Sequence, residues 1–166
     1  FSADLKKMLP RIPLVDKVED FWAFSDAGRD LAKLHLNYED HAPIAWVKIV
    51  GEESGIFTVD KMRFKSRQDK SEIIYNSYIR ITNIPEVAYE YVVNGRSAID
   101  WILEKYQVTT DKASGIKNDP NDWAEEHGKP RYILDLLLSV ISLSVATVKI
   151  VKGLPKLSFK DSDNAN

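Results

Sequence analysis

The sequence contains no cysteine among its 166 residues, and it has no excess of basic side chains. Without cysteine the chain can form neither a disulfide framework nor a thiolate zinc site, and it has no cysteine nucleophile. The formal net charge is −2 at pH 7. A generally basic nucleic-acid-binding protein is therefore excluded, and any anion-binding surface must be a local patch.

Several common catalytic motifs are also missing. Residues 51–55 (GEESG) lack the Lys-Ser/Thr ending and the following helix of a phosphate-binding loop. His35 and His41 are six residues apart, a spacing that does not place two imidazoles on one helical face for a metal. No serine lies in a strand–turn–helix elbow with a histidine partner. We therefore expect no metal, no cofactor and no enzymatic activity in this chain alone.

The chain has no long, purely apolar run. Its most apolar stretch, residues 133–148, is 16 residues long and is interrupted by Asp135 and three serines. A membrane span needs about 20 mostly apolar residues, so this stretch predicts a long buried helix and no membrane association. The first residue is Phe1 and no signal-peptide pattern follows. We expect a segment of a longer, cytoplasmic polypeptide.

The remaining periodicity predicts an α+β fold. Helical spacing over residues 17–36 predicts an amphipathic helix, and Gly28 in its middle predicts a close helix crossing there. The predicted inner face consists of Val18, Phe21, Ser25, Gly28, Ala32 and His35, widened by Trp22, Leu31 and Leu34. Between about residues 45 and 82 the period changes to two, which predicts a small antiparallel sheet. This sheet packs with several helices, including the long apolar C-terminal helix.

Residues 91–123 contain strong boundary signals. Asn94-Gly95 is expected to end a helix that begins near Pro85, because both residues tolerate the left-handed conformation. Ser97 and Asp100 form a capping box that starts the next helix. That helix buries one face, consisting of Ile99, Ile102, Leu103 and Tyr106. Residues 109–121 are predicted to be a polar loop, followed by a short helix capped by Asn121 or Asp122, with Trp123 as a packing anchor.

Basic residues are concentrated on the predicted sheet. Residues 61–80 hold six Lys/Arg and two acidic residues, so this window carries +4 while the rest of the chain carries −6. Lys61, Arg63 and Lys65 alternate with Met62 and Phe64, which predicts a basic outer face on one strand. Such a face can grip a phosphate backbone, and it can equally be an ordinary solvated sheet surface.

A series of short motifs resembles a known family. The motifs occur in order between about residues 9 and 155, over nearly the whole chain. In this order the sequence resembles the C-terminal specificity domain of Type ISP restriction-modification enzymes, also labelled as a DEAD/DEAH-box helicase C-terminal domain. The motifs are residues 9–13 (LPRIP), 24–31 (FSDAGRDL), 36–39 (LNYE), 61–64 (KMRF), 89–99 (YEYVVNGRSAI) with Trp101, and Asp111 through residues 118–123 (NDPNDW).

The resemblance implies a division of labour in a larger enzyme. Residues 1–157 would be a target-recognition domain that binds double-stranded DNA and positions an adenine for an N6-adenine methyltransferase in the same polypeptide, and residues 158–166 a flexible tail. The parent would carry a nuclease and a helicase-like motor, and it would use ATP, Mg²⁺ and S-adenosylmethionine. Residues 118–123 lack the second proline and adjacent aromatic residue of the Asn/Asp-Pro-Pro-aromatic loop that holds a flipped adenine, so the chain would be the reader alone.

Two groups of side chains are the candidate DNA contacts. Phosphate contacts are expected from Lys61, Arg63, Lys65, Arg67, Lys70 and Arg80. Contacts to bases or from loops are expected from Asn76, Tyr78, Asn94, Arg96, Asn118 and Asn121.

The sequence is also compatible with other interpretations. Asn94 and Arg96 can instead serve as a helix cap and a surface ion pair. The chain can be a structural or protein-docking domain that reads no bases. An enzymatic role would require a carboxylate pair such as Asp119 and Asp122 to bind a metal.

Overall fold

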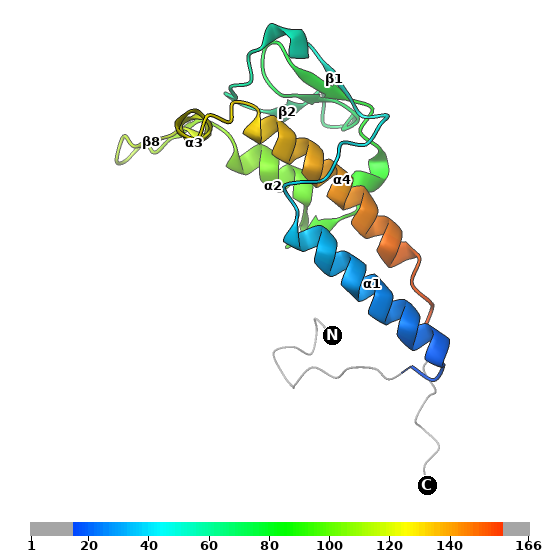
Figure 1. The fold of residues 1–166 in the computed structure, drawn as a ribbon. Helices are drawn as coiled ribbons and strands as arrows, with labels where there is room; N and C mark the ends of the chain where they lie inside the picture. Colours follow the sequence, from blue (N-terminus) through cyan, green and yellow to red (C-terminus); the bar gives the residue numbers. More distant parts are fainter. Residues whose placement is uncertain (1–14, 158–166) are drawn as a thin grey trace.

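Four short antiparallel strands form the main sheet, in the order β1–β4–β3–β2 (Figure 1). The computed structural model describes residues 15–157, so the predicted tail at residues 158–166 lies outside this part. The strands are β1 (Lys48–Val50), β2 (Arg63–Phe64), β3 (Ile73–Ile74) and β4 (Arg80–Thr82). Ile81 pairs with Ile49 on one side and with Ile73 on the other. The predicted small antiparallel sheet and the α+β class are confirmed.

Helix α4 (Tyr132–Lys152) is the central element of the core. It contacts α1, α2 and the 3₁₀ helix η2 (Glu86–Tyr89), and its first turns lie beneath the sheet in Figure 1. Leu134, Leu137 and Ile141 are buried in one cluster with the sheet residues Ile73 and Ile81. By length and composition α4 could cross a membrane, but 67% of its apolar window is buried inside the protein. It is the predicted long core helix.

Serines on α4 bind the segment that connects the first helix to the sheet. The Ser139 hydroxyl accepts a hydrogen bond from the His41 backbone N–H and donates one to the Tyr38 carbonyl, both at 2.8 Å. The Ser142 hydroxyl donates to the Ala42 carbonyl at 2.9 Å. The polar residues that interrupt the apolar run therefore satisfy the backbone of a loop that crosses the helix.

Helix α1 (Val18–Leu36) runs beside α4 (Figure 1), and it turns only part of the predicted face inward. Val18, Phe21 and Gly28 are exposed, and a Cβ at Gly28 would meet no atom within 4 Å, so the predicted close crossing is wrong. The helix carries apolar side chains on two sides. Its half-buried residues are Asp20, Ala23, Phe24, Ser25, Ala27, Leu31 and Leu34, of which only Ser25, Leu31 and Leu34 belong to the predicted face.

Asn94-Gly95 forms a hairpin turn and does not end a helix. It joins β5 (Val92–Val93) to β6 (Arg96–Ser97), and both turn residues have positive φ, 51° at Asn94 and 82° at Gly95. Two successive left-handed residues are the requirement of a type I′ turn. The helix predicted from Pro85 is therefore wrong, because only the short η2 forms there.

Helix α2 (Ala98–Lys105) follows this hairpin directly, and its predicted start is confirmed. The Ser97 side chain accepts from the Asp100 backbone N–H at 3.1 Å. Ile99 and Leu103 are buried, while Ile102 and Tyr106 are half-buried, so the predicted inner face is also confirmed.

The predicted polar loop contains a second hairpin, β7 (Thr109–Thr110) and β8 (Lys117–Asn118). It leads into α3 (Pro120–Glu126), which is capped by Asp119 and not by Asn121 or Asp122 as predicted. The cap moves because Pro120 occupies the first helical turn, where its missing N–H costs nothing. In Figure 1 this hairpin extends away from the body of the protein, beyond α3.

Candidate nucleic-acid interface

The basic face predicted on the sheet is present. Lys61, Arg63 and Lys65 are exposed, whereas Met62 between them is only 2% exposed and Phe64 is half-buried. Only the segment around β2 pairs as a strand, so the alternation extends beyond the ladder itself. The buried Met62 and half-buried Phe64 hold this edge, and the cations between them face solvent.

Half of the six predicted phosphate-binding cations are engaged in ion pairs. Lys65 and Arg80 both approach Glu72, at 3.2 and 3.4 Å, and Lys70 approaches Asp100 at 3.5 Å. The Lys70 ammonium also lies 4.8 Å from the centre of the Phe64 ring. These three side chains are positioned by the protein itself, and part of their charge is compensated.

Lys61, Arg63 and Arg67 form no ion pair within residues 15–157. All three are exposed, and Arg67 lies in the turn between β2 and β3. Their positive charge is therefore uncompensated by any close carboxylate in the described part of the chain. Together with Lys65, Lys70 and Arg80 they form what we call the basic surface.

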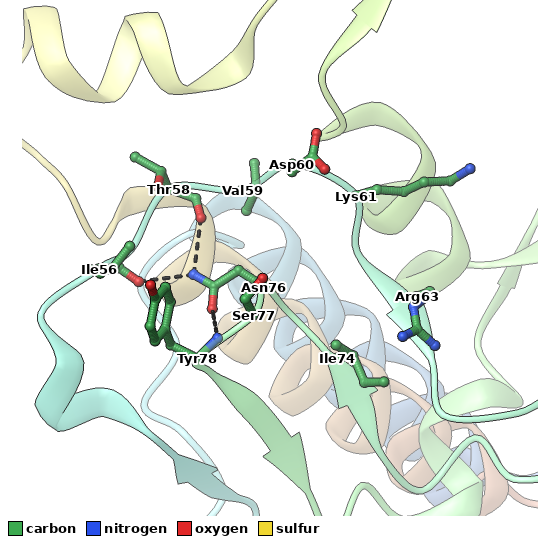
Figure 2. A pocket seen from close by; sticks show the side chains of 10 residues that line it. All are labelled: Ile56, Thr58, Val59, Asp60, Lys61, Arg63, Ile74, Asn76, Ser77 and Tyr78. Carbon is green, nitrogen blue, oxygen red and sulfur yellow. Dashed lines mark hydrogen bonds between the residues drawn. The ribbon is translucent and has the colours of Figure 1, made fainter.

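A hollow of about 310 Å³ adjoins the basic surface (Figure 2). Arg63 and the half-exposed ring of Tyr78 lie on opposite sides of it, with Ile74 and Ser77 between them. An exposed aromatic ring beside a guanidinium group offers a base or a sugar a stacking surface and a phosphate a charge.

Asn76 holds the wall of this hollow. Its amide donates to the carbonyls of Ile56 and Thr58, and its oxygen accepts from the backbone N–H of Tyr78 (Figure 2). The same oxygen also accepts from the backbone N–H of Ile79. Both donors and both acceptor positions are thus occupied. The side chain joins the β3–β4 turn to the strand-like segment opposite, and it positions Tyr78.

Asn121 has a similar bridging role. Its oxygen accepts from the Val59 N–H and its amide donates to the Val59 carbonyl, both at 2.8 Å. In effect it pairs with Val59 as a neighbouring strand would. Asn118, by contrast, is exposed on β8, and no side-chain hydrogen bond engages it within the described residues.

Asn94 and Arg96 lie on the β5–β6 hairpin, outside the segment of residues 61–80 that carries the basic surface. Arg96 pairs with Glu104, and its guanidinium lies 5.0 Å from the centre of the Trp101 ring. Trp101 in turn donates to the Val93 carbonyl at 2.8 Å. The surface ion pair considered for Arg96 is present, and Asn94 acts as a turn residue.

The metal alternatives find no support in the geometry. No cluster of three or more possible ligands occurs among the described residues. His35 contacts the Tyr91 hydroxyl and His41 the Leu34 carbonyl. The hydrogen bond from Lys117 lowers the pKa of Asp119, whose carboxylate also accepts from Asn121. This carboxylate is therefore an anchor of the β8–α3 junction.

The feature that sequence reasoning missed is the β7–β8 hairpin, which we call the ribbon (residues 109–118). Its turn signal was available: Asp111 is followed by Ser114 and Gly115, and Gly115 has a φ of 74°. An Asp whose side chain binds the backbone two and three residues on, before a glycine, is typical of a tight turn. The two-residue strands are too short to show alternation.

The fold and the basic surface define a small α+β domain with a candidate site for anionic polymers. The family model described as the Type ISP C-terminal specificity domain matches residues 1–136, and the chain belongs to this family. No curated protein sequence matches the chain.

Solved structures agree with this assignment. The chain is similar to a nuclease-deletion mutant of the Type ISP restriction-modification enzyme LlaGI in complex with a DNA substrate mimic, with 44% identity, a TM-score of 0.83, and coverage of 97% of this chain and 15% of that one. The chain is also similar to the ATP-dependent Type ISP restriction-modification enzyme LlaBIII bound to DNA, with 44% identity, a TM-score of 0.82, and coverage of 96% of this chain and 10% of that one. Its similarity to a DrdV–DNA complex has 26% identity, a TM-score of 0.70, and coverage of 93% of this chain and 16% of that one. The chain thus spans a small part of the length of each.

Proposed function

We propose that this chain is the part of a Type ISP restriction-modification enzyme that recognises a double-stranded DNA target. The observation that carries the proposal is the set of exposed cations Lys61, Arg63 and Arg67, which form no ion pair within residues 15–157; Lys61 and Arg63 also line the Tyr78 hollow. Family membership and the DNA complexes of LlaGI and LlaBIII support it.

In this proposal the basic surface binds the phosphate backbone and fixes the register of the protein on the duplex. Arg63 and Lys61 carry most of the electrostatic contribution, because no carboxylate pairs with them in the described part of the chain. Lys65, Lys70 and Arg80 are held in place by Glu72 and Asp100 and add contacts in fixed positions. Asn76 and Asn121 bind backbone groups of residues 56–59, the segment that leads into Lys61, and so hold it in position.

The finer parts of the proposal concern the parent enzyme. The domain, residues 1–157, positions an adenine for an N6-adenine methyltransferase in the same cytoplasmic polypeptide, and it has no enzymatic activity alone. The parent uses ATP, Mg²⁺ and S-adenosylmethionine. Methylation mapping of the intact polypeptide, with and without this domain, tests these statements: loss of site-specific adenine methylation without the domain is expected, and unchanged site-specific methylation would contradict them.

The first prediction concerns phosphate contacts. Replacing both Lys61 and Arg63 with Ala is expected to weaken binding to every duplex sequence, because backbone contacts carry no sequence information. The slope of log affinity against log salt concentration should become shallower by about 0.9 for each lost contact. Fluorescence-anisotropy titrations of this chain with a labelled duplex at several salt concentrations measure both quantities.

The matched control removes the same charge elsewhere. Lys33 and Lys149 border the groove between α1 and α4, away from the basic surface. Their double replacement with Ala is expected to leave the slope nearly unchanged. An unchanged slope in the Lys61 and Arg63 variant would exclude this surface from DNA binding.

One observation favours a second candidate function, protein docking within the parent. The outer face of α1 exposes Val18, Phe21 and Trp22, at 68%, 55% and 53%. Neighbouring exposed apolar side chains of this size mark interaction surfaces. Replacing Phe21 and Trp22 with polar residues should leave DNA affinity unchanged if α1 only docks, whereas the Lys61 and Arg63 variant should lower it.

A further inference from the structure

We propose that the ribbon (residues 109–118) enters the DNA major groove and reads base edges. This inference rests on the proposed function, because it assigns base reading within the same DNA-binding domain. It concerns a different element from the basic surface, and it predicts a different measurable property, sequence preference in place of overall affinity.

The first observation is exposure. Every residue from Thr109 to Asn118 is exposed, including Ile116, whose side chain is 68% exposed. In Figure 1 the ribbon extends from the body past α3. The major groove is about 12 Å wide and about 8.5 Å deep and admits a two-stranded ribbon. Four residues of extended chain reach about 13 Å, which is enough to cross the depth of the groove.

The second observation is that the ribbon has a defined conformation before it meets any partner. Thr109 pairs with Asn118, and Thr110 pairs with Lys117. The Asp111 carboxylate accepts from the Ala113 and Ser114 N–H groups and from the Ser114 hydroxyl, at 2.7 to 3.1 Å. The Asp111 N–H donates to the Ile116 carbonyl at 2.9 Å. Such preorganisation reduces the entropy lost on binding.

The third observation is that the root of the ribbon is attached to the segment that carries the basic surface. The Val108 N–H donates to the Asp60 carbonyl at 3.0 Å, and Asp60 immediately precedes Lys61. After the other strand, Asn121 in the first turn of α3 binds both backbone groups of Val59. A duplex held by Lys61 and Arg63 therefore lies next to the point from which the ribbon extends.

The chemistry of the two ribbon faces differs. Side chains alternate along a strand, and directly paired residues share a face. Thr109, Asn118 and Ile116 therefore belong to one face, together with Asp111, whose carboxylate binds the turn, and Thr110 and Lys117 belong to the other. An Asn amide binds adenine N6 and N7, a Thr hydroxyl can bind either base, and an apolar group contacts the thymine methyl. The first face is suited to A·T pairs.

The second face carries one cation. The Lys117 ammonium pairs with Asp119 at 2.8 Å, which fixes its position and compensates part of its charge, and Lys112 lies at the turn. A protein-docking ribbon would be expected to carry aromatic residues and few lysines. This ribbon has no aromatic residue, one isolated large apolar side chain and two lysines. The composition therefore favours DNA over a protein partner.

The test selects duplexes from a random-sequence library with this chain at low salt and sequences those retained. The main variant replaces residues 111–116 with Asn-Gly, which preserves the pairing of Thr110 with Lys117 through a two-residue turn. We expect this variant to keep its affinity for bulk duplex within about threefold, since Lys61 and Arg63 remain. Its preference for the selected sequence should fall by about tenfold or more.

A second pair of variants keeps the ribbon intact. Asn118→Ala and Ile116→Ala change exposed side chains on the proposed reading face, and each should lower the preference at one A·T position. Thr110→Ala, on the opposite face, is the matched control and should not. Circular dichroism and thermal unfolding confirm that each variant folds, so the point variants decide the matter if the shortened ribbon does not fold.

The outcomes separate the two proposals. If the unaltered chain selects a sequence and the ribbon variants select it equally well, the inference is overturned while the proposed function holds. If the unaltered chain retains no duplex at low salt, the proposed function and the inference fail together. Loss of preference with retained bulk affinity supports the inference.

Discussion

At the scale of single residues, Gly51 controls the approach of the loop before β2 to the main sheet. Its φ is 88°, and a Cβ at this position would lie 1.9 Å from the Tyr78 carbonyl oxygen. Tyr78 immediately precedes the buried Ile79 and lines the hollow beside Arg63. A side chain at residue 51 would therefore displace backbone that supports both the core and the candidate interface.

Gly51→Ala is expected to lower the free energy of unfolding by about 2 to 5 kcal/mol, the sum of a left-handed backbone and a steric conflict. Urea unfolding monitored by tryptophan fluorescence measures it. Gly55→Ala is the matched control, because Gly55 also has a positive φ, 66°, but no atom lies within 4 Å of its Cβ position. That variant should lose only about 1 to 2 kcal/mol. Equal losses would contradict the steric argument.

Single residues also show where sequence reasoning ends. Ser97 and Asp100 could be predicted as a capping pair because their hydrogen bond spans three residues of one chain segment. The amides of Asn76 and Asn121 could not be assigned, because their partners at residues 56–59 are 18 to 62 residues away. From residue type alone these two asparagines were predicted to contact DNA bases. In the structure their side-chain amides form hydrogen bonds with backbone groups of the protein.

At the scale of elements, the two hairpins explain the main errors of prediction. Asn94-Gly95 can end a helix or form a type I′ turn, since both need left-handed residues. The flanking Val92 and Val93 favour a strand, and the structure forms one.

The inward face of α1 could not be predicted for another reason. Apolar residues occur on two sides of this helix, and only packing against α4 selects one of them.

The ribbon turn is expected to open in acid. The pKa of Asp111 lies below its ordinary value of 3.8, chiefly because its carboxylate accepts a hydrogen bond from the Ser114 N–H and, as a smaller contribution, one from the Ser114 hydroxyl. A lowered pKa in the folded state means that the charged carboxylate stabilises the turn above pH 3.8, and that this stabilisation is lost as the pH falls through the folded pKa. The amide resonances of Ala113 and Ser114 should therefore shift together below about pH 3.8.

NMR spectra recorded from pH 6 to pH 2 measure this transition. In Asp111→Asn the side chain still offers an oxygen acceptor but does not titrate in this range, so the same resonances should no longer follow it. Shifts that persist unchanged in this variant would assign the transition to another group.

At the scale of the whole molecule, helix α4 connects the sheet to the other helices of the fold. Twelve residues of α4 are buried, and seven of them share a cluster with residues of β3, β4 and α2, whereas α1 has no buried residue. Local stability follows the number of buried apolar contacts. The overall class, the small sheet and the core helix were predictable from periodicity, because each depends on a pattern that spans a whole element.

Hydrogen exchange should reveal this hierarchy. Amides of α4 and β4 are expected to exchange only through global unfolding, while those of α1 should exchange at least about tenfold faster. Mass spectrometry or NMR of the exchanging chain measures both sets. Equal protection of α1 and α4 would indicate that contacts of α1 outside α4 stabilise it.

Glu72 lies inside the basic surface and pairs with both Lys65 and Arg80, and only 14% of its side chain is exposed. For a protein that must find one site among many, such a carboxylate has a kinetic consequence. Non-specific affinity depends on the number of phosphates neutralised, and a protein that binds every sequence tightly leaves each wrong site slowly. In the proposed function, Glu72 holds two cations partly compensated, which is expected to shorten the dwell time on random DNA and to make the search for the target faster than the number of cations alone would allow.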